Sequence, residues 1–283
     1  MTPILLTPLD LAIASLLVLA SAGLSMLLTL GVHRPLLIAS TRMVVQLVLV
    51  GFVLRQIFAI SSGWLTALAV GVMLAAASRE VGARSPRRLS GLWHYAVGTA
   101  SIVIATVTVA VIALTTALRP TPWNDAHHVI PLVGIIVGNV MNAASLALNS
   151  VFSTVTRERA AIDARLALGA TRAQAFETIV RQAVMAGIIP TINQMAAAGI
   201  ITLPGIMTGQ VLAGMDPLEA AKYQILLMFV LAGGGFLGSL IAVEIAVRRL
   251  SDKRQRLRLD RLDSKIEARV ASRDARIKKK GSE

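Results

Sequence analysis

The stretch RERAAIDARLALGATRAQAFETIVR, residues 157–181, is polar and basic and lies between two long apolar runs of the chain. A bilayer-spanning helix could not hold its five arginines, so the stretch is predicted to lie outside the lipid. Apolar residues such as Ile162 and Leu166 repeat within it at helical spacing. Gly169 is typical of a helix end. We therefore expect a short helix, a turn at Gly169 and a second short helix, fixed between two membrane helices.

The rest of the chain is strongly apolar, since 55% of its 283 residues are hydrophobic. Several runs approach the ~20 residues that a helix needs to cross a bilayer. Seven spans are predicted near residues 9–31, 36–58, 62–78, 95–118, 129–152, 182–203 and 221–247, the third being the shortest. The first ten residues lack the basic residues of a signal peptide, so we expect the first span to be retained. The sequence thus predicts an all-α, polytopic membrane protein.

The distribution of basic residues predicts how these spans are oriented. With the N-terminus outside, 24 of the 28 Lys and Arg residues fall on the cytoplasmic side, where such residues are enriched in membrane proteins. We therefore expect an N-out/C-in topology, with residues 1–250 as the membrane domain, residues 153–181 as a cytoplasmic loop and residues 251–283 as a basic cytoplasmic tail. The net charge of +13 is accordingly not taken as a sign of nucleic-acid binding.

The basic tail carries apolar residues at helical spacing, namely Leu259, Leu262, Ile266 and Val270. Two interpretations remain open for it. It could form a solvated or membrane-surface helix attracted to anionic lipid, or it could be a docking segment for a partner.

The chain lacks the motifs of common catalytic and metal sites. It contains no P-loop of the form GxxxxGK[ST] and no HExxH motif, and the absence of cysteine excludes disulfides and thiolate ligands. His127 and His128 with Asp125 are compatible with an external metal contact or, more simply, with a solvated loop. No enzymatic activity and no cofactor are expected in this chain, and metal ligands stay unassigned.

Polar residues inside the predicted spans are costly in hydrocarbon and usually face other helices or a water-filled path. Arg42 and Gln46 lie four residues apart, on one face of the second span. A polar stripe follows the fifth span at spacings of three or four residues: Asn139, Asn142, Ser145 and Asn149. Both interhelical packing and a translocation path remain open as interpretations of this stripe.

The sixth span contains signals that would disturb its backbone. Pro190 lies in its middle and should kink the helix, which frees backbone carbonyls beside Asn193. Pro204 and Gly205 should end it, and the apolar residues that follow are predicted to form a re-entrant or interfacial element near the outer mouth. The candidate translocation path is therefore Arg42, Gln46, Asn139, Asn142, Asn193, Pro204, Gly205, Met207, Thr208 and Gln210.

The segment DARLALGA, residues 163–170, resembles the EAA…G signature of ABC-transporter permeases, a helix that docks into a groove of the ATPase. Asp163 stands where glutamate is usual, and Gly169 follows six residues later, as in that signature. The usual Leu-Pro further on is absent. Together with ASTR (39–42), GNVMNAASLAL (138–148) and LPGIMTGQVLAG (203–214), the segment resembles the FetB/YbbM-type permease family of bacteria, which is similar to the plant aluminium-sensitivity membrane subunits. The resemblance covers about residues 9 to 247.

This resemblance implies a permease subunit of an ABC transporter in the plasma or inner membrane. Such a subunit pairs with a second copy of itself and with a separate ATP-binding subunit, which would hold ATP and Mg²⁺. Bacterial members are assigned to iron export, so iron or another metal is the expected cargo. The implied docking residues are Ile162, Asp163, Arg165, Leu166, Leu168, Gly169 and Ala170.

A gradient-driven secondary transporter or channel for a metal or small solute is the alternative. It would couple protons through acids inside the membrane, and Glu244 is the only acid well inside a predicted span.

Overall fold

The computed structural model describes residues 7–60, 62–84, 87–118, 125–252 and 255–264. This described part is helical apart from one short two-stranded ribbon. Seven of its helices are long and apolar enough to cross a membrane, which confirms the predicted number of spans. The protein is therefore a helical, multi-pass membrane protein.

The chain divides into two compact units. The first unit runs to Ser62 and includes Leu212–Gly214. Its two helices, α1 (Pro8–Leu27) and α2 (His33–Ile60), pack against each other. Most of their apolar side chains are exposed within this unit, which is the distribution expected of helices that meet lipid or other protein.

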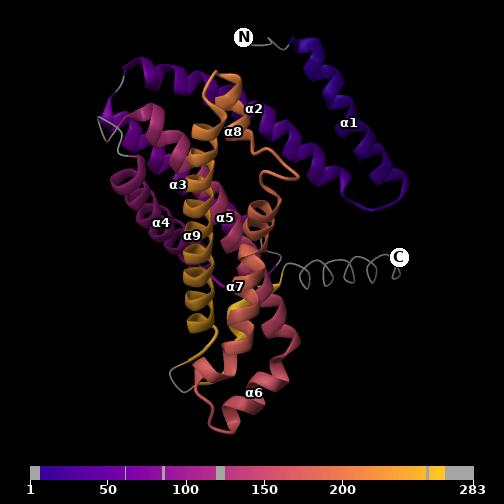
Figure 1. Ribbon diagram of the computed structural model, residues 1–283. Coiled ribbons are helices and arrows are strands. Elements are labelled where there is room, and N and C mark those ends of the chain that lie inside the picture. Colours follow the sequence, from indigo (N-terminus) through magenta and orange to yellow (C-terminus); the bar gives the residue numbers. More distant parts are fainter. Residues whose placement is uncertain (1–6, 61, 85–86, 119–124, 253–254, 265–283) are drawn as a thin grey trace. The chain divides into compact units, whose positions relative to one another are not determined.

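The second unit holds the remaining long helices and the core. They are α3 (Gly63–Arg84), α4 (Trp93–Ile112) with its π-helical continuation η1 (Ala113–Leu118), α5 (Ala126–Arg157), α7 (Arg172–Ala197) and α9 (Pro217–Arg249). Two short helices, α6 (Arg159–Ala167) and α8 (Gly205–Leu212), precede and follow α7. Figure 1 shows α9 running along α5, and α4 and α7 also pack against α9.

Small residues allow α5, α7 and α9 to approach closely. A Cβ placed on Gly238 of α9 would lie 2.6 Å from Cγ1 of Val140 on α5. A Cβ placed on Gly187 of α7 would overlap Oγ of Ser239 and lie 2.7 Å from the carbonyl oxygen of Ala143. Glycine at such positions is typical of membrane helices, whose association depends on close packing rather than on the hydrophobic effect.

Several helix boundaries differ from the prediction, including three in α3 and α7. Residues 172–181 are not a separate short helix, because α7 begins at Arg172 and continues into the span. The third span is longer than predicted, since α3 extends past the apolar run to Arg84. The sixth ends earlier than predicted, at Ala197, while Pro190 lies inside the helix without ending it. Hydropathy marks the part of a helix that lies in lipid, and these helices extend beyond it or stop within it.

The beginning of the basic tail is not helical, so the predicted helix is wrong for Leu259 and Leu262. Strand β2 (Leu262–Ser264) pairs antiparallel with β1 (Arg87–Leu89), and a 3-10 turn, η2 (Leu259–Arg261), precedes it. Both leucines pack against the core of the second unit. The backbone thus pairs with a distant segment rather than with itself. Ile266 and Val270 lie outside the described residues.

Candidate functional site

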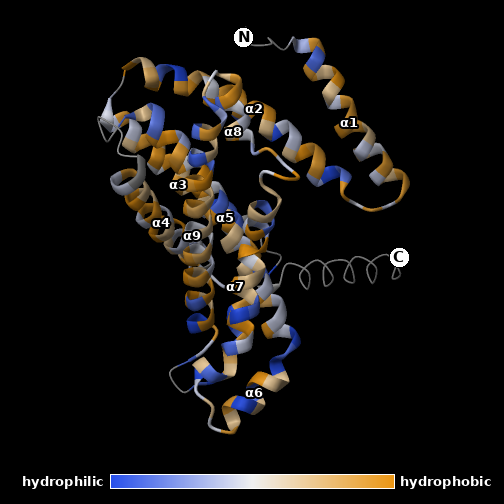
Figure 2. Cartoon of the chain, in the orientation of Figure 1, coloured by the Kyte–Doolittle hydropathy of each residue, from blue (hydrophilic) through white to orange (hydrophobic). Residues whose placement is uncertain are grey.

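The polar stretch forms a helix-turn-helix at one end of the second unit. Figure 1 shows α6 beyond the ends of α5 and α7, and Figure 2 shows hydrophilic residues gathered there. Ile162 is only 2% exposed and belongs to the core, and Leu166 packs partly against it. Both were expected to contact a partner. The buried Ile162 and the half-buried Leu166 hold α6 against the rest of the unit, and their contact with a partner stays a prediction.

The turn after α6 has the geometry of a Schellman motif. Gly169 adopts a φ of +89°, in the left-handed region that favours glycine. Its N–H donates to the carbonyl of Leu166, and the N–H of Ala170 donates to the carbonyl of Arg165, both at 3.1 Å. These bonds satisfy carbonyls that the helix end leaves open. The glycine that ends α6 is therefore required by the backbone.

The start of α7 fixes the other side of the turn. Thr171 Oγ1 accepts a hydrogen bond from the N–H of Gln174 at 3.4 Å, and Gln174 Oε1 accepts one from the N–H of Thr171 at 2.9 Å. This is a capping box. The side chain of Gln255 accepts a further bond from the N–H of Arg172 at 2.8 Å, which ties the turn to the C-terminal segment.

The exposed face of this helix-turn-helix combines one large apolar side chain with charges. Leu168 is 88% exposed at the tip, immediately before the turn. Asp163 and Arg165 are also exposed, and Asp163 lies 3.5 Å from the guanidinium of Arg159. Ala170 is half-buried. We call residues 159–171 the coupling turn. It presents Leu168 on a backbone that the Schellman motif and the capping box hold in place.

A second candidate site is a cavity of about 300 Å³ where α7 ends. Its lining comes from the end of α7, the link to α8, α8 itself and α9: Gln194, Thr202, Pro204, Gly205, Ile206, Gln224, Leu227, Met228 and Leu231. It includes Pro204 and Gly205 of the predicted path. We call it the α7–α9 cavity.

Several backbone groups of the link between α7 and α8 form hydrogen bonds within the link or with the end of α7. Gly199 has a φ of +88°, and its N–H donates to the carbonyl of Thr202 at 2.9 Å. The N–H groups of Ile201 and Thr202 both donate to the carbonyl of Ala197, at 3.0 and 3.1 Å. Non-helical backbone at membrane depth is tolerated where its polar groups are satisfied within protein. A break in the helix is present, but it begins after Ala197 rather than at Pro204 and Gly205 as predicted, and Gly205 is instead the first residue of α8.

Gln224 brings an unsatisfied polar atom to the cavity. Its side chain is 6% exposed, and its Oε1 has no hydrogen-bond partner among the described residues. A buried acceptor without a partner costs about 1–3 kcal/mol, so this amide oxygen is suited to bind water or a solute that enters the cavity. Gln210 Oε1 on α8 is likewise without a partner in the described chain.

Asn139 joins the three central helices beside the cavity. Its Nδ2 donates to the carbonyl of Leu231 on α9 at 2.6 Å, and Thr191 Oγ1 on α7 donates to its Oδ1 at 3.1 Å. Leu231 also lines the cavity. Asn139 thus contributes to interhelical packing and connects α5 and α7 to a residue of the cavity wall.

The other predicted path residues lie elsewhere. Asn142 and Asn193 are exposed, and neither lines the α7–α9 cavity. Met207 and Thr208 are half-buried on α8, where Thr208 Oγ1 donates to the carbonyl of Pro204 at 3.2 Å. Arg42 and Gln46 belong to the first unit, where both are exposed on α2.

Sequence reasoning did not select Gln224 or Thr191. A signal existed for Gln224, because it is an amide side chain near the start of an apolar run. Thr191 offered none, since a single threonine in a membrane helix usually bonds to its own backbone.

His128, at the start of α5, pairs with the neighbouring Asp125. Nδ1 of His128 lies 2.5 Å from the carboxylate of Asp125, and this hydrogen bond lowers the pKa of Asp125. Among the described residues, no group of three or more His, Cys, Asp or Glu side chains is placed to hold a metal ion.

Comparison with known proteins places the chain among multi-pass membrane proteins. Residues 8–251 match a family described as uncharacterised, UPF0014. A UPF0014 membrane protein of Synechocystis is 35% identical over 81% of this chain and 87% of its own length. The probable iron export permease protein FetB of Escherichia coli is 32% identical over 90% and 96%. The protein ALUMINUM SENSITIVE 3 of Arabidopsis thaliana is 30% identical over 81% and 82%. No solved structure matches the chain.

Proposed function

The chain belongs to the UPF0014 family of membrane proteins, and on that premise we propose that it is the permease subunit of an ABC transporter, driven by a separate ATP-binding subunit. The observation that carries the proposal is the coupling turn. It holds an almost fully exposed leucine, Leu168, on a capped backbone between two membrane helices. Such an element can receive force from a soluble motor.

A single helix connects the coupling turn to the α7–α9 cavity. α7 contains 26 residues, from Arg172 at the turn to Ala197 at the cavity, which corresponds to about 39 Å. Through Thr191 and Asn139 it is bonded to α5, which enters the turn from the other side. Closure of the ATPase dimer would move the turn and tilt α5 and α7 together. The cavity would then alternate between its inward- and outward-open states.

We propose iron or another metal as the cargo, because the relative in Escherichia coli is named a probable iron export permease. The α7–α9 cavity offers only neutral oxygens, from Gln194, Thr202 and Gln224 among others. Hard cations accept oxygen ligands, but neutral amides and hydroxyls hold them more weakly than carboxylates do. The cavity therefore suits a cargo that passes through rather than one that stays bound.

The proposal includes an N-out/C-in orientation, which places the coupling turn in the cytoplasm with its ATPase. It also includes a second copy of the chain. The broadly apolar exposed surface of α1 and α2 provides area for lipid and for that copy.

The experiment is flux into or out of vesicles that contain the full-length chain and its ATP-binding subunit. Several cations and one organic solute are compared, with and without ATP. Leu168→Asn should abolish co-purification of the ATPase and ATP-driven flux. Leu92→Asn is the matched control, because Leu92 is 85% exposed and lies outside the turn. Normal coupling in Leu168→Asn would refute the docking role.

The same assay tests the alternative. Flux that persists without ATP and without a partner would indicate a gradient-driven transporter or channel. One observation speaks against proton coupling: Glu244 accepts a hydrogen bond from Nε of Arg248 at 2.7 Å, near the end of α9. Its carboxylate is thus paired with a neighbour on the same helix and does not line the α7–α9 cavity.

A further inference from the structure

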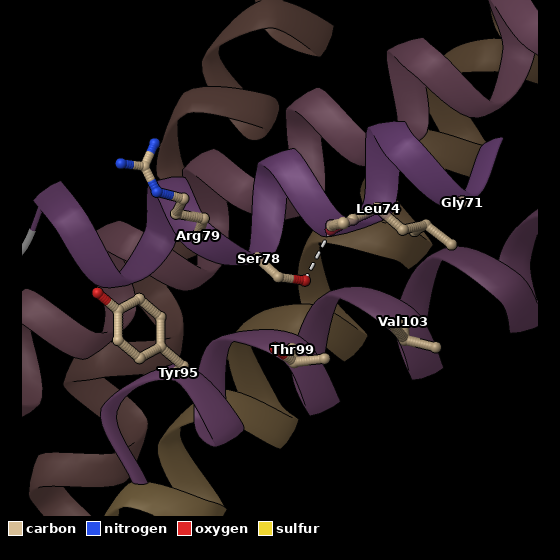
Figure 3. A pocket seen from close by; sticks show the side chains of 8 residues that line it. Gly71, Leu74, Ser78, Arg79, Tyr95, Thr99 and Val103 are labelled. Carbon is tan, nitrogen blue, oxygen red and sulfur yellow. Dashed lines mark hydrogen bonds between the residues drawn. The ribbon is translucent and has the colours of Figure 1, made fainter. Parts of the chain in front are cut away.

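A groove of about 570 Å³ lies between α3 and α4, away from the coupling turn and from the lining of the α7–α9 cavity. Figure 3 shows Gly71 and Leu74 on α3 facing Val103 of α4 at one end. Arg79 of α3 and Tyr95 of α4 lie at the other end (Figure 3). The groove therefore has an apolar end and a polar end.

Small side chains explain why the two helices leave this space open. Gly71 and Ala75 lie one turn apart on α3, and a Cβ placed on Gly71 would meet no described atom within 4 Å. Ser78 continues this face, but its hydroxyl donates to the carbonyl of Leu74 at 2.7 Å. The hydroxyl of Ser78 is thus already bonded to the backbone, and the wall from Gly71 to Ser78 offers an apolar surface.

The polar end of the groove lies at the edge of the membrane-spanning part. The apolar stretch of α3 ends at Gly82, three residues beyond Arg79. At the start of α4, the centroid of the Trp93 ring lies 4.7 Å from Cζ of Arg249. Tryptophan, tyrosine and arginine together are typical of the level where lipid headgroups meet the protein. Arg79 is exposed and is among the residues that line the groove.

We propose that this groove binds one anionic phospholipid. The guanidinium of Arg79 would contact the phosphate, and an acyl chain would lie along Gly71, Ala75 and Val103. From Arg79 to Gly71 the helix rises about 12 Å, which is long enough for a large part of one chain. A free phosphate would use Arg79 alone and leave the apolar end empty, so the whole groove matches a lipid and not an inorganic anion. The inference does not depend on the proposed transport function.

The test is native mass spectrometry of the full-length protein with phosphatidylglycerol or phosphatidylcholine. Arg79→Gln should retain about fivefold less phosphatidylglycerol, since one basic residue near an anionic membrane contributes about 1 kcal/mol. Ala75→Leu should fill the groove and reduce retention of both lipids. Arg181→Gln, which removes an exposed arginine of α7 outside the groove, should retain as much lipid as the unmodified protein.

Three results would overturn the proposal. The first is unchanged retention in both groove variants while each still elutes as a folded protein. The second is displacement of phosphatidylglycerol by inorganic phosphate, which would reduce the site to a simple anion contact. The third is efficient cross-linking of Ala75→Cys, whose thiol would be unique in this cysteine-free chain, to a second copy in the membrane. That result would show protein, not lipid, covering the groove.

Discussion

The α5–α7–α9 junction and the α3–α4 groove are both built from small residues, yet the first is closed and the second is open. At the junction, Gly187 and Gly238 have backbone or side-chain atoms of other helices directly against them. In the groove, Gly71 has open space beside it. This difference indicates that small residues allow two helices to approach closely but do not by themselves bring them together. Whether helices close depends on what the facing helix presents.

The most severe test of this comparison is Gly187→Leu. The new side chain would collide with Ser239 and with the carbonyl of Ala143, so we expect a loss of about 3 kcal/mol of stability or failure to accumulate in the membrane. Gly71→Leu is the matched control and should melt like the unmodified protein. Thermal melting in detergent measures both. Equal melting of the two variants would mean that the junction is not closed.

Gly169→Leu tests whether the turn depends on the backbone conformation of its glycine, since the space beside Gly169 is open. A side chain at Gly169 would meet open space, as at Gly71, but its φ of +89° disfavours any residue with a Cβ by about 1–2 kcal/mol. We expect the coupling turn to change shape and most ATP-driven flux to be lost, while the protein stays in the membrane. ATP hydrolysis and flux are measured together.

Gly169→Asn is the control for that variant, because asparagine tolerates the left-handed region better than leucine. It should retain most of the coupling. If Gly169→Leu transports normally, the turn does not need its glycine conformation.

Asn139→Ala tests whether the junction depends on its polar bonds as well as on its packing. Removing both hydrogen bonds should cost about 1–2 kcal/mol, because each contributes about 1 kcal/mol. Asn149→Ala removes an exposed amide of the same polar stripe, and its melting should not change measurably. Equal effects of the two variants would argue that the hydrogen bonds of Asn139 do not stabilise the contact between the helices.

The smallest expected effect is at Asp260, an exposed residue of the C-terminal segment. A hydrogen bond from Arg258 lowers the pKa of Asp260 to about 2, from an ordinary value of 3.8. A lowered pKa in the folded state stabilises the protein above pH 3.8, and that contribution disappears as the pH falls to about 2. Asp260→Asn should flatten this part of the melting curve against pH. An unchanged pH profile would contradict the pairing.

The sequence predicted what depends on local patterns. Seven apolar runs indicated the seven spans, and Gly169 indicated the end of α6. Pro204 and Gly205 indicated that the helical path is interrupted near the end of the sixth span, although α7 already ends at Ala197. Each of these follows from hydropathy or from the conformation of one residue.

Features that depend on distant contacts could not be predicted. The ribbon pairs Leu89 with Leu262, and nothing in either segment alone indicates the other. Likewise, Asn139 gains its role from a carbonyl on α9 and a hydroxyl on α7. The groove at Gly71 differs from the junction at Gly187 only through the facing helix.

The bond from Gln255 to the first N–H of α7 carries a consequence for biosynthesis. Residue 255 leaves the ribosome after all seven spans, whereas the coupling turn is translated about eighty residues earlier. The turn therefore gains this hydrogen bond only after all seven spans have been translated. A nascent chain that has not reached residue 255 would contain every span and would still lack this hydrogen bond at the coupling turn.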